Sequence, residues 1–304
     1  MAKARGPVGG VFVRVAAAGL LTAALVGIAV VAIQAGSAGA AFPGAQGWIV
    51  FDQLNPSSGL VEIQRINPDG TLPVRLTEDG SDPAFSPDTK KLALVRGGDI
   101  YKLNANGRRL IRLSRGGASD FDPAWSADGE RIVFARRRGD SDAEIYSIKA
   151  NGKKQRRLTD NSVTDRHPAW SPSGKRIAFS RGGKDFDIRT MKPNGKKQKR
   201  LTGGAKRSDS RPNWSPDGKT IAFAATSGAG ASAIYTMRAN GKQRRIITSG
   251  ALGGDAPAFS PDGSLILFEG IGATGPLGIY VMRPDGTEPR RLALTGSNPD
   301  WQPR

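Results

Sequence analysis

Apolar and polar positions follow one another in short stretches beyond residue 45, and no segment there sustains the 3.6-residue apolar period of a helix. The stretches have a fixed order: a strand such as PAW, the turn SPDG, a strand such as KRIAF, a variable loop, a strand such as AIYTM, an Asn-Gly turn and a strand such as RRLT. Strands joined by tight turns pair antiparallel. We therefore expect an all-β fold built from units of four antiparallel strands.

The unit recurs along the chain, and its PAW motif ends in an aromatic residue each time. Successive aromatics are 40, 45, 44, 45 and 42 residues apart; they are Phe85, Trp125, Trp170, Trp214, Phe259 and Trp301. Four-stranded sheets at this period are typical of β-propeller blades, which surround a central channel. We expect the aromatic side chains to wedge between neighbouring blades.

A second recurring feature is a turn between the last two strands of each unit. The turns are Asn106-Gly107, Asn151-Gly152, Asn194-Gly195, Asn240-Gly241 and Asp285-Gly286. Asn-Gly and Asp-Gly tolerate positive φ at both central positions, as a type I′ hairpin turn demands. We expect such a hairpin at the outer edge of every blade.

The two ends of the chain supply complementary fragments of one unit. Residues 47–77 contain three strands without a preceding PAW strand, and the C-terminal NPDW contains a PAW-like strand with nothing after it. Pairing them removes an open sheet edge and closes the ring. The sequence thus predicts a six-bladed propeller in a domain spanning 42–304, with repeats near 82–121, 122–166, 167–210, 211–255 and 256–297 and a shared blade formed by 47–81 and 298–304.

The repeat xPAWSPDGxxIAF, followed by DIYxMxxNG and RRLT, resembles the propeller of the TolB family, envelope proteins of the Tol–Pal system. The resemblance covers about residues 47–304 and implies a protein-interaction role in the cell envelope. The propellers of prolyl-oligopeptidase-like enzymes and of oligogalacturonate lyases contain the same repeat, so the resemblance is specific for fold and not for function. No segment of this chain corresponds to the N-terminal α/β domain of TolB.

The first 41 residues have the layout of an export segment. Residues 1–14 contain three basic residues and no acid, residues 15–33 carry no charge, and Ala38-Gly39-Ala40 resembles a signal-peptidase site. The uncharged run is also long enough to span a bilayer. We expect either a cleaved signal peptide or an uncleaved anchor helix, and in both cases a propeller outside the cytoplasm: periplasmic, on the cell surface or secreted.

The composition limits the chemistry of the exported part. With no cysteine, thiol catalysis and disulfides are excluded. No G-x-S-x-G nucleophile motif occurs, and the glycines of 270–275 precede a repeat strand where a dinucleotide site needs a helix. No catalytic constellation and no bound cofactor are therefore predicted.

The only histidine, His167, precedes the proline of its PAW motif, where the other units have Asp82, Asp122, Arg211, Ala256 and Asn298. Because the six units together hold five residue types there, we interpret the position as a variable loop site at the channel mouth. The predicted interaction residues are His167, Arg166, Arg211, Asp122 and Asp82.

Acidic residues just before several PAW strands leave two interpretations open. Converging carboxylates could bind Ca²⁺ through oxygen ligands, with Asp120, Asp165 and Asp209 as candidates. Alternatively, these carboxylates cap turns and balance neighbouring arginine and lysine side chains.

The net charge of +18 is concentrated in basic runs after the Asn-Gly turns, including 153–157 and 196–200. Cations on an outer strand protect an exposed sheet edge, and a basic belt could also adhere to anionic wall polymer or lipid headgroups. The runs lack the aromatic residues that stack on bases, so nucleic acid is not an expected partner.

We expect a monomeric, non-catalytic module that binds envelope proteins. The alternatives are an envelope polysaccharide lyase or hydrolase with a site at the channel mouth, and a basic adhesin for anionic wall polymer.

Overall fold

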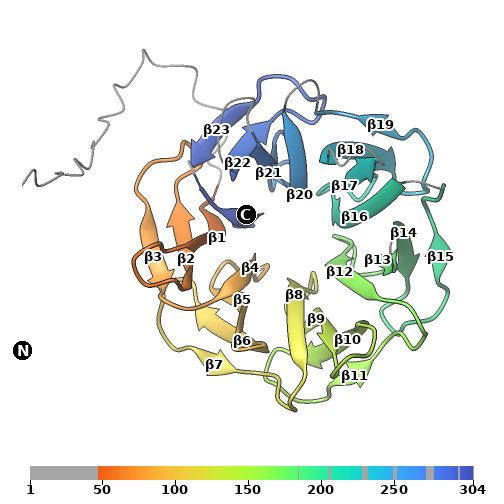
Figure 1. Cartoon of the computed structure of the whole chain (residues 1–304), viewed down its shortest axis with the longest axis horizontal. Coiled ribbons are helices and arrows are strands. Elements are labelled where there is room, and N and C mark those ends of the chain that lie inside the picture. The colour runs from red at the N-terminus through yellow and green to blue at the C-terminus, as the bar shows by residue number, and fades with distance from the viewer. Residues whose placement is uncertain are drawn as a thin grey trace, which may run out of the picture. The chain divides into compact units, whose positions relative to one another are not determined.

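Six four-stranded sheets form a ring in the computed structural model of this chain (Figure 1). The structure describes residues 47–183, 185–204, 207–227, 232–248, 252–271, 277–293 and 295–303, and these contain no helix. The prediction of an all-β, six-bladed propeller is confirmed. The predicted export segment 1–41 lies outside the described residues, and within them no helix is long and apolar enough to cross a membrane.

Each blade is a purely antiparallel sheet. The strands of blades 1 to 3 are, from the channel outward, β24 (Ser297–Trp301), β1 (Ile49–Leu54), β2 (Val61–Ile66) and β3 (Val74–Thr77); β4 (Ser81–Phe85), β5 (Lys91–Arg96), β6 (Asp99–Asn104) and β7 (Ile111–Arg112); and β8 (Ser119–Trp125), β9 (Arg131–Arg137), β10 (Glu144–Lys149) and β11 (Arg156–Arg157). Blades 4 to 6 consist of β12 (Asp165–Trp170), β13 (Ile177–Gly182), β14 (Phe186–Met191) and β15 (Lys199–Arg200); β16 (Arg207–Trp214), β17 (Thr220–Ser227), β18 (Ser232–Arg238) and β19 (Arg245–Ile246); and β20 (Gly253–Phe259), β21 (Ile266–Ile271), β22 (Leu277–Met282) and β23 (Arg290–Ala293).

Both ends of the propeller meet in blade 1, as the sequence predicted. Strand β24 pairs with β1 in the register Ile49 to Trp301 and Val50 to Asp300. One residue further on, the Gln302 N–H donates to the Trp48 carbonyl over 2.8 Å. The C-terminal strand is therefore the inner strand of the first blade, and β1 is paired on both sides.

The core lies between blades, since each sheet packs its two faces on its two neighbours. One buried cluster joins Val95 and Ile100 of blade 2 to Ile132 and Phe134 of blade 3. The repeat aromatics lie at the same boundaries. The indole Nε1 of Trp125, Trp214 and Trp301 each donates to an alanine carbonyl of the preceding blade, at 3.2, 3.3 and 3.2 Å.

The outer hairpins correct one prediction, because Asn-Gly does not form the two central residues of a type I′ turn. In blade 2 the Gly107 N–H donates to the Asn104 carbonyl at 2.9 Å, so Ala105 and Asn106 are the central residues. Only the glycine of the Asn-Gly pair has positive φ, 80° at Gly107. The asparagine amide oxygen accepts the Arg108 N–H instead, as an Asx turn does. Proline, which stands before the asparagine or aspartate in three of the blades, favours this type I geometry.

The SPDG turns form as predicted. In blade 5 the Gly218 N–H closes the turn on the Ser215 carbonyl at 2.8 Å, and the serine hydroxyl donates to Asp217 Oδ1 at 2.6 Å. These turns and the outer hairpins share one end of each blade, since the Ala105 N–H donates to the Lys90 carbonyl at 2.9 Å. We call this end the turn-side face.

Two glycines separate the effect of backbone conformation from that of close packing. Gly107 and Gly174 have φ of 80° and 68°, but a Cβ at Gly107 would lie 2.9 Å from the Leu76 carbonyl, whereas a Cβ at Gly174 meets nothing within 4 Å. We expect Gly107→Ala to cost about 2 kcal/mol of unfolding free energy and Gly174→Ala about 1 kcal/mol. Denaturant unfolding measures both, and equal losses would contradict the packing argument.

Candidate functional site

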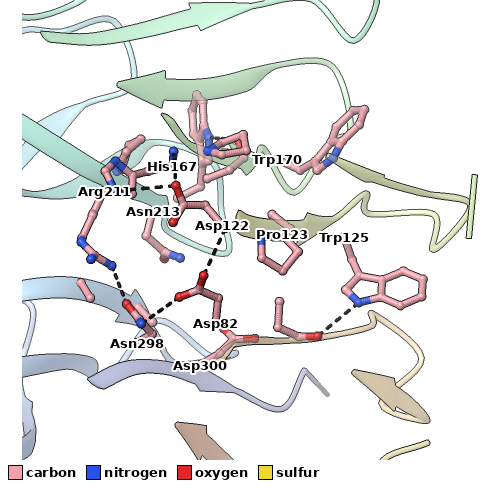
Figure 2. Close-up of a pocket in the computed structure, with 18 of the residues that line it drawn as sticks. Asp82, Asp122, Pro123, Trp125, His167, Trp170, Arg211, Asn213, Asn298 and Asp300 are labelled. Atoms are coloured by element: carbon pink, nitrogen blue, oxygen red, sulfur yellow. Dashed lines mark hydrogen bonds and ion pairs between the residues drawn. The ribbon is translucent and has the colours of Figure 1, made fainter. Parts of the chain in front are cut away.

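The inner strands enclose a central cavity of about 320 Å³ (Figure 2). All six blades contribute the same short stretch, from the residue before the proline toward the repeat aromatic. Small alanine side chains occupy the middle of this stretch in four blades, at Ala84, Ala124, Ala169 and Ala258. The cavity therefore exists because the repeat places small residues where six strands converge.

The residue before each proline lies in a β-bulge and has positive φ. The register between inner and second strand shifts at this point in every blade, and φ lies between 48° and 55° at Asp82, Asp122, His167, Arg211, Ala256 and Asn298. We call these six the bulge residues. The interpretation of this position as a loop site is wrong: it belongs to the inner strand, and all six residues line the cavity.

Hydrogen bonds link neighbouring bulge residues around the channel. The His167 N–H donates to Asp122 Oδ2 at 3.1 Å, and the Asp122 N–H donates to Asp82 Oδ2 at 3.4 Å (Figure 2). The side-chain amide of Asn298 continues the series by donating to Asp82 Oδ1 at 2.9 Å. Each carboxylate thus holds the backbone of the next blade.

Arg211 spans the part of the channel where blade 6 offers only the small side chain of Ala256. Its Nη1 donates to Asn298 Oδ1 at 2.5 Å, two blades further on (Figure 2). Its Nε lies 3.4 Å from Asp255 Oδ1. Arg166 does not line the cavity; it pairs with Asp122 at 3.3 Å and stacks on Phe121. Four of the five predicted interaction residues are therefore together in the channel, and the fifth supports one of them.

Burial changes the protonation of this group. It raises the pKa of Asp82 to about 7, and the Asp122 and Asp52 carboxylates act in the same direction. Burial lowers the pKa of His167 to about 4, so the imidazole is neutral at pH 7. For Asp122, burial alone raises the pKa, but His167, Arg166 and Arg211 outweigh it and leave the pKa below the ordinary value.

Two further polar groups in the channel were not predicted. Asp300 and Asn213 occupy the alanine position of the PAW motif in blades 1 and 5. Each accepts a backbone N–H of the following blade: Phe85 N–H to Asp300 Oδ2 at 2.8 Å, and Phe259 N–H to Asn213 Oδ1 at 3.0 Å. The sequence did contain a signal for both, since NPDW and RPNW depart from PAW at this position.

The calcium candidates Asp120, Asp165 and Asp209 do not converge on the channel. They occupy equivalent positions in three blades, two residues before the bulge residue, and none lines the cavity. Asp120 forms a two-point ion pair with Arg136, at 2.5 and 2.7 Å. Asp165 pairs in the same way with Arg181, at 2.6 and 2.7 Å.

Asp209 differs because its strand partner is Ala225, and Arg207 and Arg244 neutralise its carboxylate instead. These geometries agree with the charge-balance interpretation of all three acids. Within the described residues, no group of three His, Asp or Glu side chains is arranged to hold a metal ion.

Comparison with known proteins agrees with this architecture. Residues 48–227, more than half of the chain, match the family described as TolB beta propeller domain. The chain belongs to this family. The resemblance to the TolB propeller that the repeat motifs indicated is therefore confirmed.

The fold of this chain is similar to those of several solved propeller structures. TolB from Acinetobacter baumannii superposes with a TM-score of 0.75 at 24% identity, over 86% of this chain and 68% of that one. The putative TolB from Agrobacterium tumefaciens gives 0.67 and 24%, over 84% and 92%. An oligogalacturonate lyase in complex with manganese gives 0.59 and 16%, over 82% and 74%. At these identities the likeness establishes the fold alone.

Proposed function

We propose that this TolB-family propeller is a non-catalytic protein-interaction module of the cell envelope, and that its channel mouth receives a segment of the partner. The observation that carries the proposal is the set of bulge residues. Blade 6 forms the same bulge with Ala256, so the fold itself does not require charge there. Burying charged groups is costly, and their presence at Asp82, Asp122 and Arg211 is explained by recognition.

The chemistry of the mouth suits a peptide segment. Carboxylates, a guanidinium and a neutral imidazole face one cavity of about 320 Å³. The cavity can therefore bind both the hydrogen-bond donors and the hydrogen-bond acceptors of a partner. Similarity to TolB supports an envelope role. The envelope location also rests on the export layout of residues 1–41.

The enzyme alternative has less support. A site on envelope polysaccharide would need free carboxylates in the channel, but Asp120 and Asp165 are held by Arg136 and Arg181 outside it. The channel carboxylates of Asp82 and Asp122 accept the backbone N–H groups of the next bulge residues. The side-chain exposure of Asp120 is 0% and that of Arg136 is 2%. Removing such a carboxylate leaves an unpaired buried guanidinium, so lost activity after Asp120→Ala would report instability instead of catalysis.

In-cell crosslinking of the full chain, followed by mass spectrometry, tests the proposed function. The variant Arg211→Asn with His167→Asn keeps the backbone, because Asn298 already occupies the same bulge and asparagine tolerates positive φ. We expect the wild-type protein to capture envelope proteins and this variant to lose them, while Lys90→Gln with Lys219→Gln on the turn-side face retains them. Unchanged capture by the channel variant would refute the proposal.

A further inference from the structure

The outer hairpins divide the ring into a basic side and a nearly neutral side. Each hairpin comprises eleven equivalent residues: 67–77, 104–114, 149–159, 192–202, 238–248 and 283–293 in blades 1 to 6. Their formal charges in that order are 0, +3, +5, +5, +4 and +1. Blades 3 and 4 are therefore the centre of a basic sector, and the nearly neutral blades 6 and 1 lie on the opposite side of the ring.

Most of the charge in blades 3 and 4 is uncompensated. Of the ten cations in 149–159 and 192–202, only Arg157 and Arg200 lie within ion-pair distance of an acid in the part of the chain that the structure describes. The other eight are Lys149, Lys153, Lys154, Arg156, Lys192, Lys196, Lys197 and Lys199. All of these except Lys149 are exposed.

The two hairpins form one continuous surface. Arg156 Nη2 of blade 3 donates to the Asn194 carbonyl in the turn of blade 4, at 3.2 Å. On the same turn-side face, the 171–176 turn of blade 4 adds the exposed side chains of Lys175 and Arg176. We call this surface, formed by 149–159, 192–202 and 171–176, the basic face.

Protection of sheet edges does not explain this distribution. The outermost strands β3 and β23 have four residues each and are the longest exposed edges among the described strands, yet their hairpins carry charges of 0 and +1. Strands β11 and β15 have two residues each, and their hairpins carry +5. The charge is greatest where an edge needs least protection.

We infer that the basic face binds a flexible polymer with repeated negative charges. Concentrated like charge destabilises the free protein, and an anionic partner relieves this repulsion. Seven of the eight uncompensated cations are lysines, compact point charges that do not select a fixed planar geometry. Neither hairpin contains an aromatic residue for stacking on bases, and neither has an exposed large apolar side chain for insertion into a bilayer.

The basic face and the bulge residues are at opposite ends of the inner strands, although the cavity reaches Ser171 and Pro172 of the 171–176 turn. The inference rests on the surface cations and does not depend on the proposed function. The bulge residues lie near the start of the inner strands, beside the loops between second and third strands, since the Asp165 N–H donates to the Ala143 carbonyl at 2.7 Å. The basic face lies at the turn-side face.

The test measures binding of the full chain to long-chain inorganic polyphosphate over a range of salt concentrations. The test variant replaces Lys153, Lys154, Lys196 and Lys197 by glutamine. Lys154 and Lys197 have positive φ, and Gln243 is the native residue at the equivalent position with φ of 54°. The control variant removes equal charge elsewhere through Lys90→Gln, Lys219→Gln, Arg283→Gln and Arg291→Gln.

We expect the wild-type protein to bind polyphosphate, and we expect its affinity to fall as the salt concentration rises. The test variant should bind at least about tenfold more weakly near 0.1 M salt, with a log–log salt slope shallower by about 3, because each lost contact removes about 0.7 of slope on a flexible polyanion. The control should stay within about twofold of the wild type, since the four side chains that it replaces lie outside the basic face.

Three results would overturn the inference. One is equal weakening in the test and control variants, which would mean that net charge alone drives binding. Another is a wild-type protein that does not bind polyphosphate at low salt. The third is tighter retention by phosphatidylglycerol vesicles than by polyphosphate of equal total charge, which would assign the face to a lipid surface. Circular dichroism of each variant confirms that it is folded.

Discussion

Replacing Trp301 by alanine is expected to lower the free energy of unfolding by about 3–5 kcal/mol, the range for a buried aromatic truncated in a core. The Trp301 residue is 3% exposed and lies in β24, the strand that closes blade 1. Its indole also donates to the Ala258 carbonyl of blade 6. Losing the side chain opens a cavity beside the junction of the two chain ends and leaves that carbonyl without its donor.

The matched control is Trp170→Ala, at the equivalent position of blade 4. Trp170 is partly exposed, and its buried Nε1 has no hydrogen-bond partner in the structure. Removing it deletes an unsatisfied donor, which offsets part of the packing loss, so we expect about 1–2 kcal/mol. Denaturant unfolding followed by circular dichroism compares the two variants. If Trp170→Ala were the more damaging change, ring closure would not depend on the C-terminal strand in the way described.

The repeat made the architecture predictable. The motifs of each unit locate its four strands. The shared blade was indicated by the C-terminal NPDW motif, which has no strands after it, and by the fragment 47–77, which has no PAW strand before it. The local backbone geometry was harder to predict from the sequence. The five residue types at the six bulge positions resembled a loop, because a shared positive φ leaves no common side chain in the sequence. Asn-Gly was assigned to the wrong turn type because the same dipeptide also fits the end of a type I turn, with positive φ at the glycine alone.

The candidate site shows the same division between pattern and geometry. The channel position of Asp82, Asp122, His167 and Arg211 followed from their place in the repeat. The partners of the three calcium candidates did not follow, since Arg136 comes sixteen residues after Asp120 and meets it only through the register of β8 and β9. Long-range pairing of this kind leaves no local motif. The departures of Asp300 and Asn213 from alanine were visible but are informative only once the channel is known.

Asp300 leads to the second large expected effect, a substitution that stabilises the protein. Burial raises the pKa of its carboxyl to about 6, from an ordinary value of 3.8, although the Phe85 and Trp301 N–H groups donate to it. Below about pH 4 the carboxyl is protonated in both folded and unfolded protein, and it imposes no penalty. As pH rises, the unfolded chain ionises first, so the folded state loses stability until about pH 6, after which the penalty is constant.

Asp300→Asn should remove this penalty while keeping the hydrogen bond, because Asn213 accepts the equivalent N–H in blade 5 with its amide oxygen. We expect the variant to match the wild type near pH 4 and to exceed it by up to about 3 kcal/mol above pH 6, since one pKa unit corresponds to about 1.4 kcal/mol. Unfolding free energies measured across this pH range provide the check. Asp88→Asn is the control of opposite sign: the Ser86 hydroxyl lowers the pKa of Asp88, so this substitution should destabilise the protein at neutral pH. A gain for Asp300→Asn that persists unchanged at pH 4 would show that packing, and not a buried charge, sets the cost of Asp300 in the channel.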